Sequence, residues 1–503
     1  MLIKNVVFLA CLCLVGCALP PSATTPYTDQ ATVLRQDLAQ NKANIAEAAL
    51  QKEIKGDPEL YAMELGRIEQ LSGDYQDSIA QYKTIIDAFN AKATAPKIQI
   101  TKVANKVFTS KYDNSRAYAP EPYEMVLVFQ YQGMNYLAEG KPSEALVNFR
   151  QAATLQAYLN ADVLPKIQKK LPIPITPTGA PTYAELLALT RTQTSLPNSL
   201  SNGVASFVAG LSFLDAGDLN GASLSMQNAE VELPQPLLQE EAVLAMQKSG
   251  MSPDVIAEKQ KALGAPVSFP AKKKPAGTSP VFVMTEQGFV PLLQQTLHKV
   301  PIPGTNYEAN FILPYYATTA PVDVAYGLTI DGKTATPEGN LNVSVADLAV
   351  ASLVERYPKI VNDATLTTNR SINTILYDIS AINSAEQEVS ESYIPSPGES
   401  AHQLAAQIES AEDDLSDAQS TLADDVANLS ATHTTDVNIR SWSTLPEDIR
   451  IQKLELLPGS HTLILWDAQK NTVVTCSFTN QQGENSLIWI NTQLPTAVCQ
   501  QLL

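Results

Sequence analysis

The chain has few of the residues from which catalytic and metal centres are built. Its 503 residues include four histidines that lie far apart in sequence, namely His298, His402, His433 and His461. There is no H-E-x-x-H pair and no G-x-S-x-G turn, and Glu412-Asp413-Asp414 lacks the ligand spacing of an EF-hand loop. The sequence therefore predicts no catalytic residues, no metal site and no cofactor.

Basic residues and long apolar runs are also scarce. There are 34 Lys and Arg against 52 Asp and Glu, a formal charge of −18, and no apolar run of eighteen residues follows the N-terminal segment. Such a charge repels nucleic acid and anionic headgroups, so we expect neither as a partner. The missing apolar run argues against a transmembrane helix.

The N-terminal segment has the pattern of an export signal. Lys4 precedes an apolar stretch from Val6 to Val15, which is too short to span a bilayer. Leu14-Val15-Gly16-Cys17 resembles the lipobox of bacterial lipoproteins, in which the cysteine is acylated and becomes the first mature residue. We therefore predict lipidation of Cys17 and a membrane anchor; the alternatives are an ordinary cleaved signal and a buried N-terminal helix.

Few cysteines remain after such processing. Cys11 and Cys13 leave with the leader and Cys17 carries lipid, so Cys476 and Cys499 remain. An exported protein permits disulfides, but the spacing does not show whether this pair is bridged or consists of two buried thiols.

Three stretches of the N-terminal half share one pattern of small and large residues. Aligned on their first glycines, they place small residues where two helices approach and large ones where a groove is filled, a pattern that resembles the tetratricopeptide repeat. The copies are not tandem, and a generic helical bundle is the alternative. The repeat-defining residues are Leu65, Gly66, Gly73, Ser78 and Tyr82; Gly133, Tyr136, Gly140, Ala145, Phe149 and Ala152; and Gly210, Phe213, Gly217, Ala222, Met226, Ala229 and Pro234.

The C-terminal half changes to a period of two, typical of strands. Strand signals cover 281–284 and 322–330, stop, and return at 449–456, 462–466, 472–478 and 487–490. We expect an antiparallel sandwich built from these two blocks.

Helical signals separate the two blocks of strands. Ser344 is the expected N-cap of a helix that runs toward Pro358, and apolar residues from Ile372 to Val389 recur at threes and fours. Ser396 is the expected N-cap of a second arm with an apolar seam from Leu404 to Leu422. The pattern predicts an antiparallel coiled-coil hairpin, which either projects toward a partner or packs along the repeats. Its acidic outer residues are Glu409, Glu412, Asp413, Asp414, Asp417, Asp424 and Asp425.

Tyrosines gather before and within the second repeat. They could line a groove for a peptide or glycan, but large aromatics at helical spacing favour a core position. These residues are Tyr112, Tyr118, Tyr123, Tyr131 and Tyr136.

Together these segments predict an α+β multidomain protein, with a tetratricopeptide-like helical domain followed by a β-sandwich-like domain that carries an inserted helical hairpin. The predicted divisions are a lipoprotein signal peptide (1–16), a flexible tether (17–28), the helical domain (29–264), a linker (265–280), the β domain (281–343 and 434–503) and the inserted helices (344–433).

Several blocks resemble a family of bacterial lipoproteins, mostly from Gram-negative proteobacteria, that carry tetratricopeptide-like helices and have no settled activity. The blocks contain Arg116, Tyr118, Tyr123 and Glu124; 281–283 and 286–291; Arg440, Trp442 and Pro446; and 456–461. The resemblance implies an outer-membrane lipoprotein that faces the periplasm, and it carries over no catalytic residue. Ala18, after the cysteine, agrees with outer-membrane sorting.

These features favour a non-enzymatic, lipid-anchored scaffold in cell-envelope assembly, which binds partner proteins through the concave face of its repeats. The alternative is a cell-wall-binding protein or envelope enzyme with a site between the helical and β domains. The sequence leaves the partner and the oligomeric state open.

Overall fold

The fold is of the α+β class, with helices in the N-terminal half and strands in the C-terminal half. The structure, a computed structural model, describes residues 27–53, 57–91, 118–159, 161, 172–190, 202–262, 276–316, 326–394, 400–431 and 438–503. Cys17, the predicted signal peptide, Tyr112 and Arg116 lie outside these residues.

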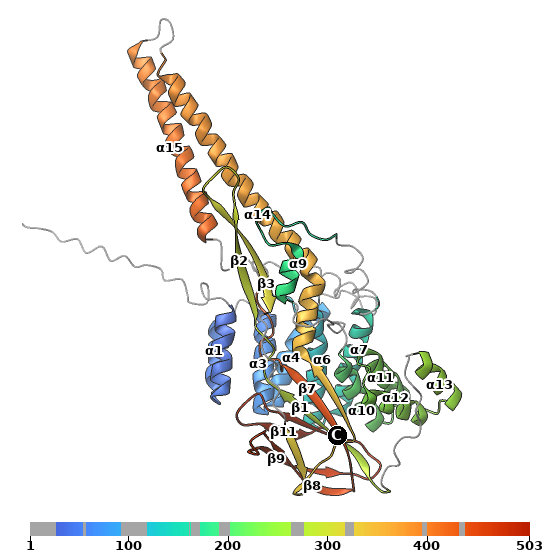
Figure 1. The fold of residues 1–503 in the computed structure, drawn as a ribbon. Coiled ribbons are helices and arrows are strands. Elements are labelled where there is room, and N and C mark those ends of the chain that lie inside the picture. The colour runs from blue at the N-terminus through green and yellow to red at the C-terminus, as the bar shows by residue number, and fades with distance from the viewer. Residues whose placement is uncertain are drawn as a thin grey trace, which may run out of the picture.

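The N-terminal half is a series of helices packed in pairs: α3 on α4, α6 on α7, and α10 on α11 (Figure 1). The inner members α3, α6 and α10 are almost entirely buried, whereas the outer members α4, α7 and α11 each keep an exposed side. The helices are α1 (Tyr27–Ala39), α2 (Ala43–Glu53), α3 (Pro58–Ser72), α4 (Tyr75–Ala91), α6 (Pro122–Ala138), α7 (Pro142–Tyr158), α9 (Tyr183–Thr190), α10 (Gly203–Asp215), α11 (Leu219–Glu232), α12 (Pro236–Lys248) and α13 (Pro253–Ala262).

Each pair is held together at a glycine that faces a large side chain. A Cβ atom on Gly66 would lie 2.8 Å from Tyr82, one on Gly133 2.5 Å from Phe149, and one on Gly210 2.8 Å from Met226. The match between small and large residues that the sequence predicts is therefore confirmed.

The turns between the paired helices repeat as well. Gly73, Gly140 and Gly217 end the inner helices with φ of +84°, +67° and +74°, a left-handed conformation that favours glycine. Ala145 and Ala222 are fully buried at equivalent places in the outer helices. Of the remaining repeat-defining residues, Phe213 is buried, whereas Tyr136 is half-buried and packs against the core.

A Gly133→Ala variant should lower the free energy of unfolding by about 1–3 kcal/mol, because its Cβ would overlap the fully buried ring of Phe149. Chemical denaturation checks this. The double variant Gly133→Ala/Phe149→Leu should recover part of the lost free energy of unfolding. If its loss equals the sum of the two single losses, Gly133 and the ring of Phe149 do not lie in close contact.

The strands form three sheets. A five-stranded sheet has the order β11-β10-β1-β7-β6, a four-stranded sheet has the order β5-β4-β8-β9, and β2 pairs with β3. The strands are β1 (Ser279–Gln287), β2 (Leu293–Pro301), β3 (Glu308–Tyr316), β4 (Gly327–Ile330), β5 (Lys333–Thr334), β6 (Gly339–Ser344), β7 (Asp448–Leu456), β8 (Gly459–Trp466), β9 (Thr472–Asn480), β10 (Ser486–Asn491) and β11 (Val498–Gln501).

One pairing differs from the expected antiparallel arrangement. β1 pairs antiparallel with β7 but parallel with β10, with Val283 opposite Ile488. β1 is buried on both faces, as central strands with a parallel neighbour usually are. The purely antiparallel expectation was therefore wrong.

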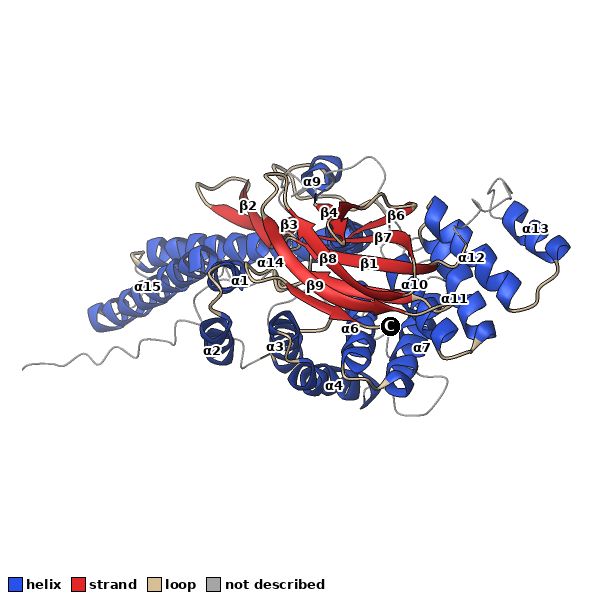
Figure 2. Cartoon of the chain, turned by 90° about the horizontal axis from the view of Figure 1, so that it is seen from below, coloured by secondary structure: helices blue, strands red, loops and turns tan. Residues whose placement is uncertain are grey.

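The five-stranded sheet lies between two layers (Figure 2). One face presents Phe282 and Met284 to the helices, in a core that extends from α1 to β10. The other face presents Val281 and Val283 to the four-stranded sheet, in a second core. Because the helical and strand-rich regions share the first core, the predicted boundaries do not separate independently packed units.

The sequence missed the strands β2, β3, β5, β6 and β11. β2 is mostly polar, and its alternation is weak because only Leu293 and Val300 are buried. Its partner β3 packs against α14 (Val345–Ser392) through a small cluster that contains Ile302, Ala309 and Ile375.

α14 and α15 (Ala401–Ala431) pack together as the predicted hairpin. The first part of α14 packs against α6, α9, β3 and β7, and the hairpin then projects away from the body (Figure 1). The first part of α14 therefore packs along the body, and the rest of the hairpin projects from it. We call residues 371–394 and 400–431 the arm.

The ends of these two helices differ in part from expectation. Ser344 caps α14 by accepting a hydrogen bond from the Asp347 amide, as expected, but α14 continues through Pro358 without ending. Ser400 caps α15 together with Gln403, whereas the expected cap Ser396 lies outside the described residues.

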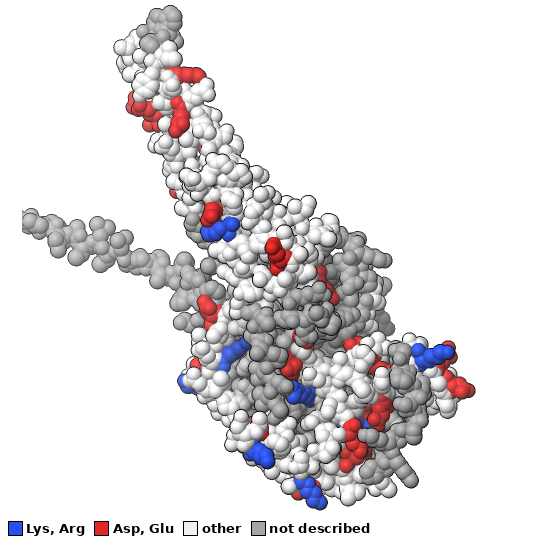
Figure 3. All heavy atoms as spheres, in the orientation of Figure 1, with Lys and Arg blue, Asp and Glu red and all other residues white. Residues whose placement is uncertain are grey.

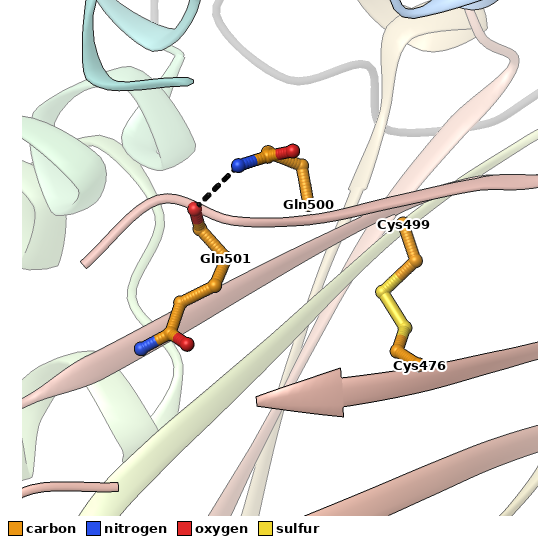
Figure 4. Close-up of a disulfide and its surroundings, with 4 residues drawn as sticks. All are labelled: Cys476, Cys499, Gln500 and Gln501. Carbon is orange, nitrogen blue, oxygen red and sulfur yellow. Dashed lines mark hydrogen bonds between the residues drawn. A yellow bond between two sulfur atoms is a disulfide. The ribbon is translucent and has the colours of Figure 1, made fainter. Parts of the chain in front are cut away.

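Cys476 of β9 and Cys499 of β11 form a disulfide that joins an edge of each large sheet (Figure 4). Their Cα atoms are 6.1 Å apart, within the usual range for a bridge. Of the two alternatives for this pair, the structure has the bridge.

The predicted tether ends too late. α1 begins at Tyr27, one residue before the predicted boundary at 28, and the side chain of Tyr27 is buried. Most of the predicted linker lies outside the described residues, and β1 begins at Ser279 within its last part.

Candidate functional site

Residues of three family-like blocks meet between the helices and the five-stranded sheet, whereas the fourth block, 456–461, lies at the turn between β7 and β8. Residues 438–447, which lead into β7, lie against α3 and α6, and their backbone amides point at two buried carboxylates. We call this group of contacts the junction.

Glu64 of α3 holds one side of the junction. Its carboxylate is fully buried and accepts hydrogen bonds from the Tyr27 hydroxyl at 2.5 Å, the Ser443 amide at 2.5 Å, and the Thr444 amide and hydroxyl at 3.1 and 2.6 Å. Four donors from two distant segments therefore satisfy one carboxylate.

Glu124 of α6 accepts a hydrogen bond from the next residue of the segment, the amide of Trp442. It accepts hydrogen bonds from the Trp442 amide at 2.8 Å, from the Glu121 amide at 2.7 Å and from the Tyr118 hydroxyl. Burial raises the pKa of Glu124 to about 7, although the hydrogen bonds from Tyr118 and Trp442 oppose this. The nearby charge of Glu64 raises it further.

A third group is a buried ion pair. Arg67 of α3 and Glu286 of β1 have no exposed side-chain surface and lie 2.6 Å apart. The Tyr131 hydroxyl and the Asn491 amide also donate to Glu286, at 2.9 and 2.8 Å. The guanidinium of Arg67 lies over the Tyr131 ring, 4.4 Å from its centre.

Two further arginines fasten the same segment. Arg440 pairs with Asp57 at the start of α3. Arg35 of α1 donates to the backbone carbonyls of Ser443 and Val290. Burial lowers the pKa of Arg35 to about 10, partly offset by Glu64 and Tyr27.

The family-like residues of the sequence are thus brought together. Tyr118, Tyr123, Glu124, Trp442 and Pro446 are all buried there. The core interpretation of the tyrosines is confirmed for Tyr118, Tyr123 and Tyr131.

Sequence reasoning missed Tyr27, Arg35, Glu64 and Arg67. Glu64 and Arg67 stand among apolar residues of α3, and a charged pair in such a setting is a signal that could have been used.

The junction is filled by its own side chains, so it joins parts of the chain rather than offering space for a substrate. The inner faces of α3, α6 and α10 are covered by the sheet, and Phe207 of α10 packs on Phe282 of β1 with ring centres 5.2 Å apart. The inner side of the repeats, expected to receive a partner, is therefore occupied by the chain itself.

The stability of the junction should depend on pH. Since the pKa of Glu124 is raised, its contribution to the free energy of unfolding is complete below about pH 4.5. This contribution is lost as the pH rises through about 7. We expect the free energy of unfolding to fall by up to about 3 kcal/mol between these limits. Urea denaturation at a series of pH values measures this.

Two variants give the control. Glu124→Gln should flatten the pH dependence, whereas Glu144→Gln, at an exposed position of α7, should leave it intact. Equal profiles for all three proteins would contradict the role of Glu124.

One stretch has the letters of a phosphate-binding loop. Gly327 to Thr334 reads G-x-x-x-x-G-K-T, but Asp331 and Gly332 form the turn of the β4–β5 hairpin with positive φ. A phosphate-binding loop needs a helix after the glycine-rich turn, so this match carries no function. His461 of β8 lies beside it, 2.8 Å from Asp331.

The arm is the most prominent surface feature, and acidic side chains gather toward its end (Figure 3). Residues 371–439 contain thirteen Asp and Glu and no Lys or Arg. No group of three or more potential metal ligands is found in the part of the chain that the structure describes. No helix in that part is long and apolar enough to cross a membrane.

No protein-family model matches this chain, and no curated protein matches its sequence.

Proposed function

We propose that the protein is a non-enzymatic, lipid-anchored scaffold of the bacterial envelope, tethered to the outer membrane through Cys17 and facing the periplasm. Its helical region is tetratricopeptide-like and its strands form a β-sandwich-like domain. It belongs, in this proposal, with the envelope lipoproteins that its sequence resembles.

The arm is the surface that we assign to partner binding. One observation carries this assignment: a two-helix hairpin projects from the body, while the inner face of the repeats is covered by the chain's own sheet. A scaffold needs exposed surface that its own fold does not use, and the arm supplies it. The partner surface thus differs from the concave face expected from the sequence.

The charge of the arm limits the partner. The arm contains eleven Asp and Glu and no Lys or Arg, and this charge repels anionic lipid headgroups, so a protein partner is favoured over the membrane. Such a field also predicts association that weakens with salt.

Photo-crosslinking in intact cells tests the assignment. A photoreactive residue at Ser384 or Asp413 of the arm should give a discrete protein adduct, whereas one at Val147 on the outer face of α7 should not. A second variant replaces residues 380–420 by a two-glycine turn and keeps Ile375, Ile379, Leu422 and Val426. It should lose the binding of the partner protein, and its body should remain folded.

Two results would contradict the proposal. Adducts from Val147 alone would move the binding surface to the outer helices, and turnover of a substrate by the purified protein would make it an enzyme. If a Cys17→Ala variant is processed normally, the protein is not anchored by a lipid on Cys17.

A further inference from the structure

Two aspartates meet inside the arm. Asp378 of α14 lies between Ile375 and Ile379, and Asp425 of α15 lies between Leu422 and Val426. The isoleucines, Leu422 and Val426 pack in one apolar cluster with Ile302 and Ala309 of the β2–β3 ribbon. The cluster fixes the two helices at the level where the aspartates face each other.

Asp378 is unusual among the acidic residues of the arm because its side chain is buried. It is 6% exposed, and no amide, hydroxyl or cation among the described residues donates to its buried Oδ2 atom. Burial, followed by the hydrogen bond and the charge of Asp425, raises the pKa of Asp378. A buried carboxylate beside a second carboxylate is stabilised when one of the two takes up a proton.

The neighbouring charges do not neutralise this pair. On α15 the adjacent residue is Asp424. On α14, apart from the exposed Tyr377, the nearest ionisable residues along the helix are Arg370 and Glu386, each eight positions away. Eight helical residues span about 12 Å, beyond the range of strong coupling at physiological salt.

The ribbon that packs on this level also supplies no cation to the pair. Its ionisable residues near the turn are His298, Lys299, Tyr307 and Glu308. Lys299 donates to Asn310, whose carbonyl oxygen accepts from Thr368, ten residues before Asp378.

We propose that Asp378 and Asp425 share one proton across the hairpin and act as a latch that closes the arm more tightly in acid. When both are ionised, their repulsion loosens the helices from this level outward. When one is protonated, its hydroxyl donates to the other carboxylate and joins the helices.

The pH window follows from the direction of the shift. A raised pKa in the closed arm means that the latch contributes fully below the ordinary value of 3.8 and is lost as the pH rises through the raised value. The inference concerns how the arm holds together, and it stands whether or not the arm binds a partner.

Hydrogen exchange of the full chain, followed by mass spectrometry, tests the latch. Arm peptides should become more protected from about pH 7 to about pH 4, by at most about tenfold per pH unit after correction for intrinsic exchange rates. Asp425→Asn replaces the shared proton by an amide donor, so its arm should be as protected at about pH 7 as the native arm is in acid.

A matched variant separates the latch from the general charge of the arm. Asp424→Asn removes an exposed carboxylate from the next position and should keep the native pH dependence. If Asp425→Asn keeps that dependence, or if the native arm shows none, the latch is wrong. Stronger protection by Mg²⁺ or Ca²⁺ than by acid would also overturn it, since the pair would then be a cation site.

Discussion

An Arg67→Met variant should lose about 3–5 kcal/mol of its free energy of unfolding, because Glu286 would remain as a buried charge without its cation. The two side chains are fully buried and 2.6 Å apart. Burial alone would lower the pKa of Arg67, but Glu286 raises it well above its usual value, so the pair is ionised in the folded protein. Urea denaturation followed by the fluorescence of the buried Trp442 and Trp489 measures the loss.

A second substitution distinguishes an uncompensated charge from lost packing. Arg67→Met/Glu286→Gln keeps an acceptor for Tyr131 and removes the charge, so it should be more stable than Arg67→Met alone. A double variant whose loss equals the sum of the two single losses would show that the residues do not act as a pair.

Removal of the disulfide should lower the free energy of unfolding by about 3 kcal/mol. Cys476 and Cys499 are 23 residues apart in sequence, and a cross-link over such a loop restricts the unfolded chain by about that amount. The Cys476→Ser/Cys499→Ser variant should unfold at lower urea concentration than the native protein and match the native protein in reducing agent.

Peptide mapping without reduction provides the direct check on this bridge. It should recover the two cysteine peptides as one linked species. Two free thiols in protein purified without reductant would contradict the bridge, and equal stability of variant and native protein would contradict its contribution.

The local parts of the fold could be predicted from the sequence, because neighbouring residues determine them. The glycines that face Tyr82, Phe149 and Met226, the cap at Ser344 and the apolar seam of the arm each depend on spacing within one or two elements. The strands with regular alternation, such as β7 and β9, were found for the same reason.

The parts that could not be predicted depend on residues far apart in sequence. The parallel pairing of β1 with β10 joins Val281 to Ser486, and the contact of Glu64 with Thr444 spans 380 residues. No local pattern specifies which buried carboxylate meets which backbone amide. For the same reason the sequence treated the helices and the sheet as separate domains, although they share one core.

This shared core has a consequence for how the chain is made. The inner helices are synthesised first, but the residues that cover them, 438–447 and β10, come near the end. Until then, apolar side chains and the carboxylates of Glu64 and Glu124 lack their native surroundings, and the nascent protein depends on other factors to keep it from aggregating. Folding is therefore completed only once the last tenth of the polypeptide has been made, and a truncated product would be a substrate for proteolysis rather than a smaller working protein.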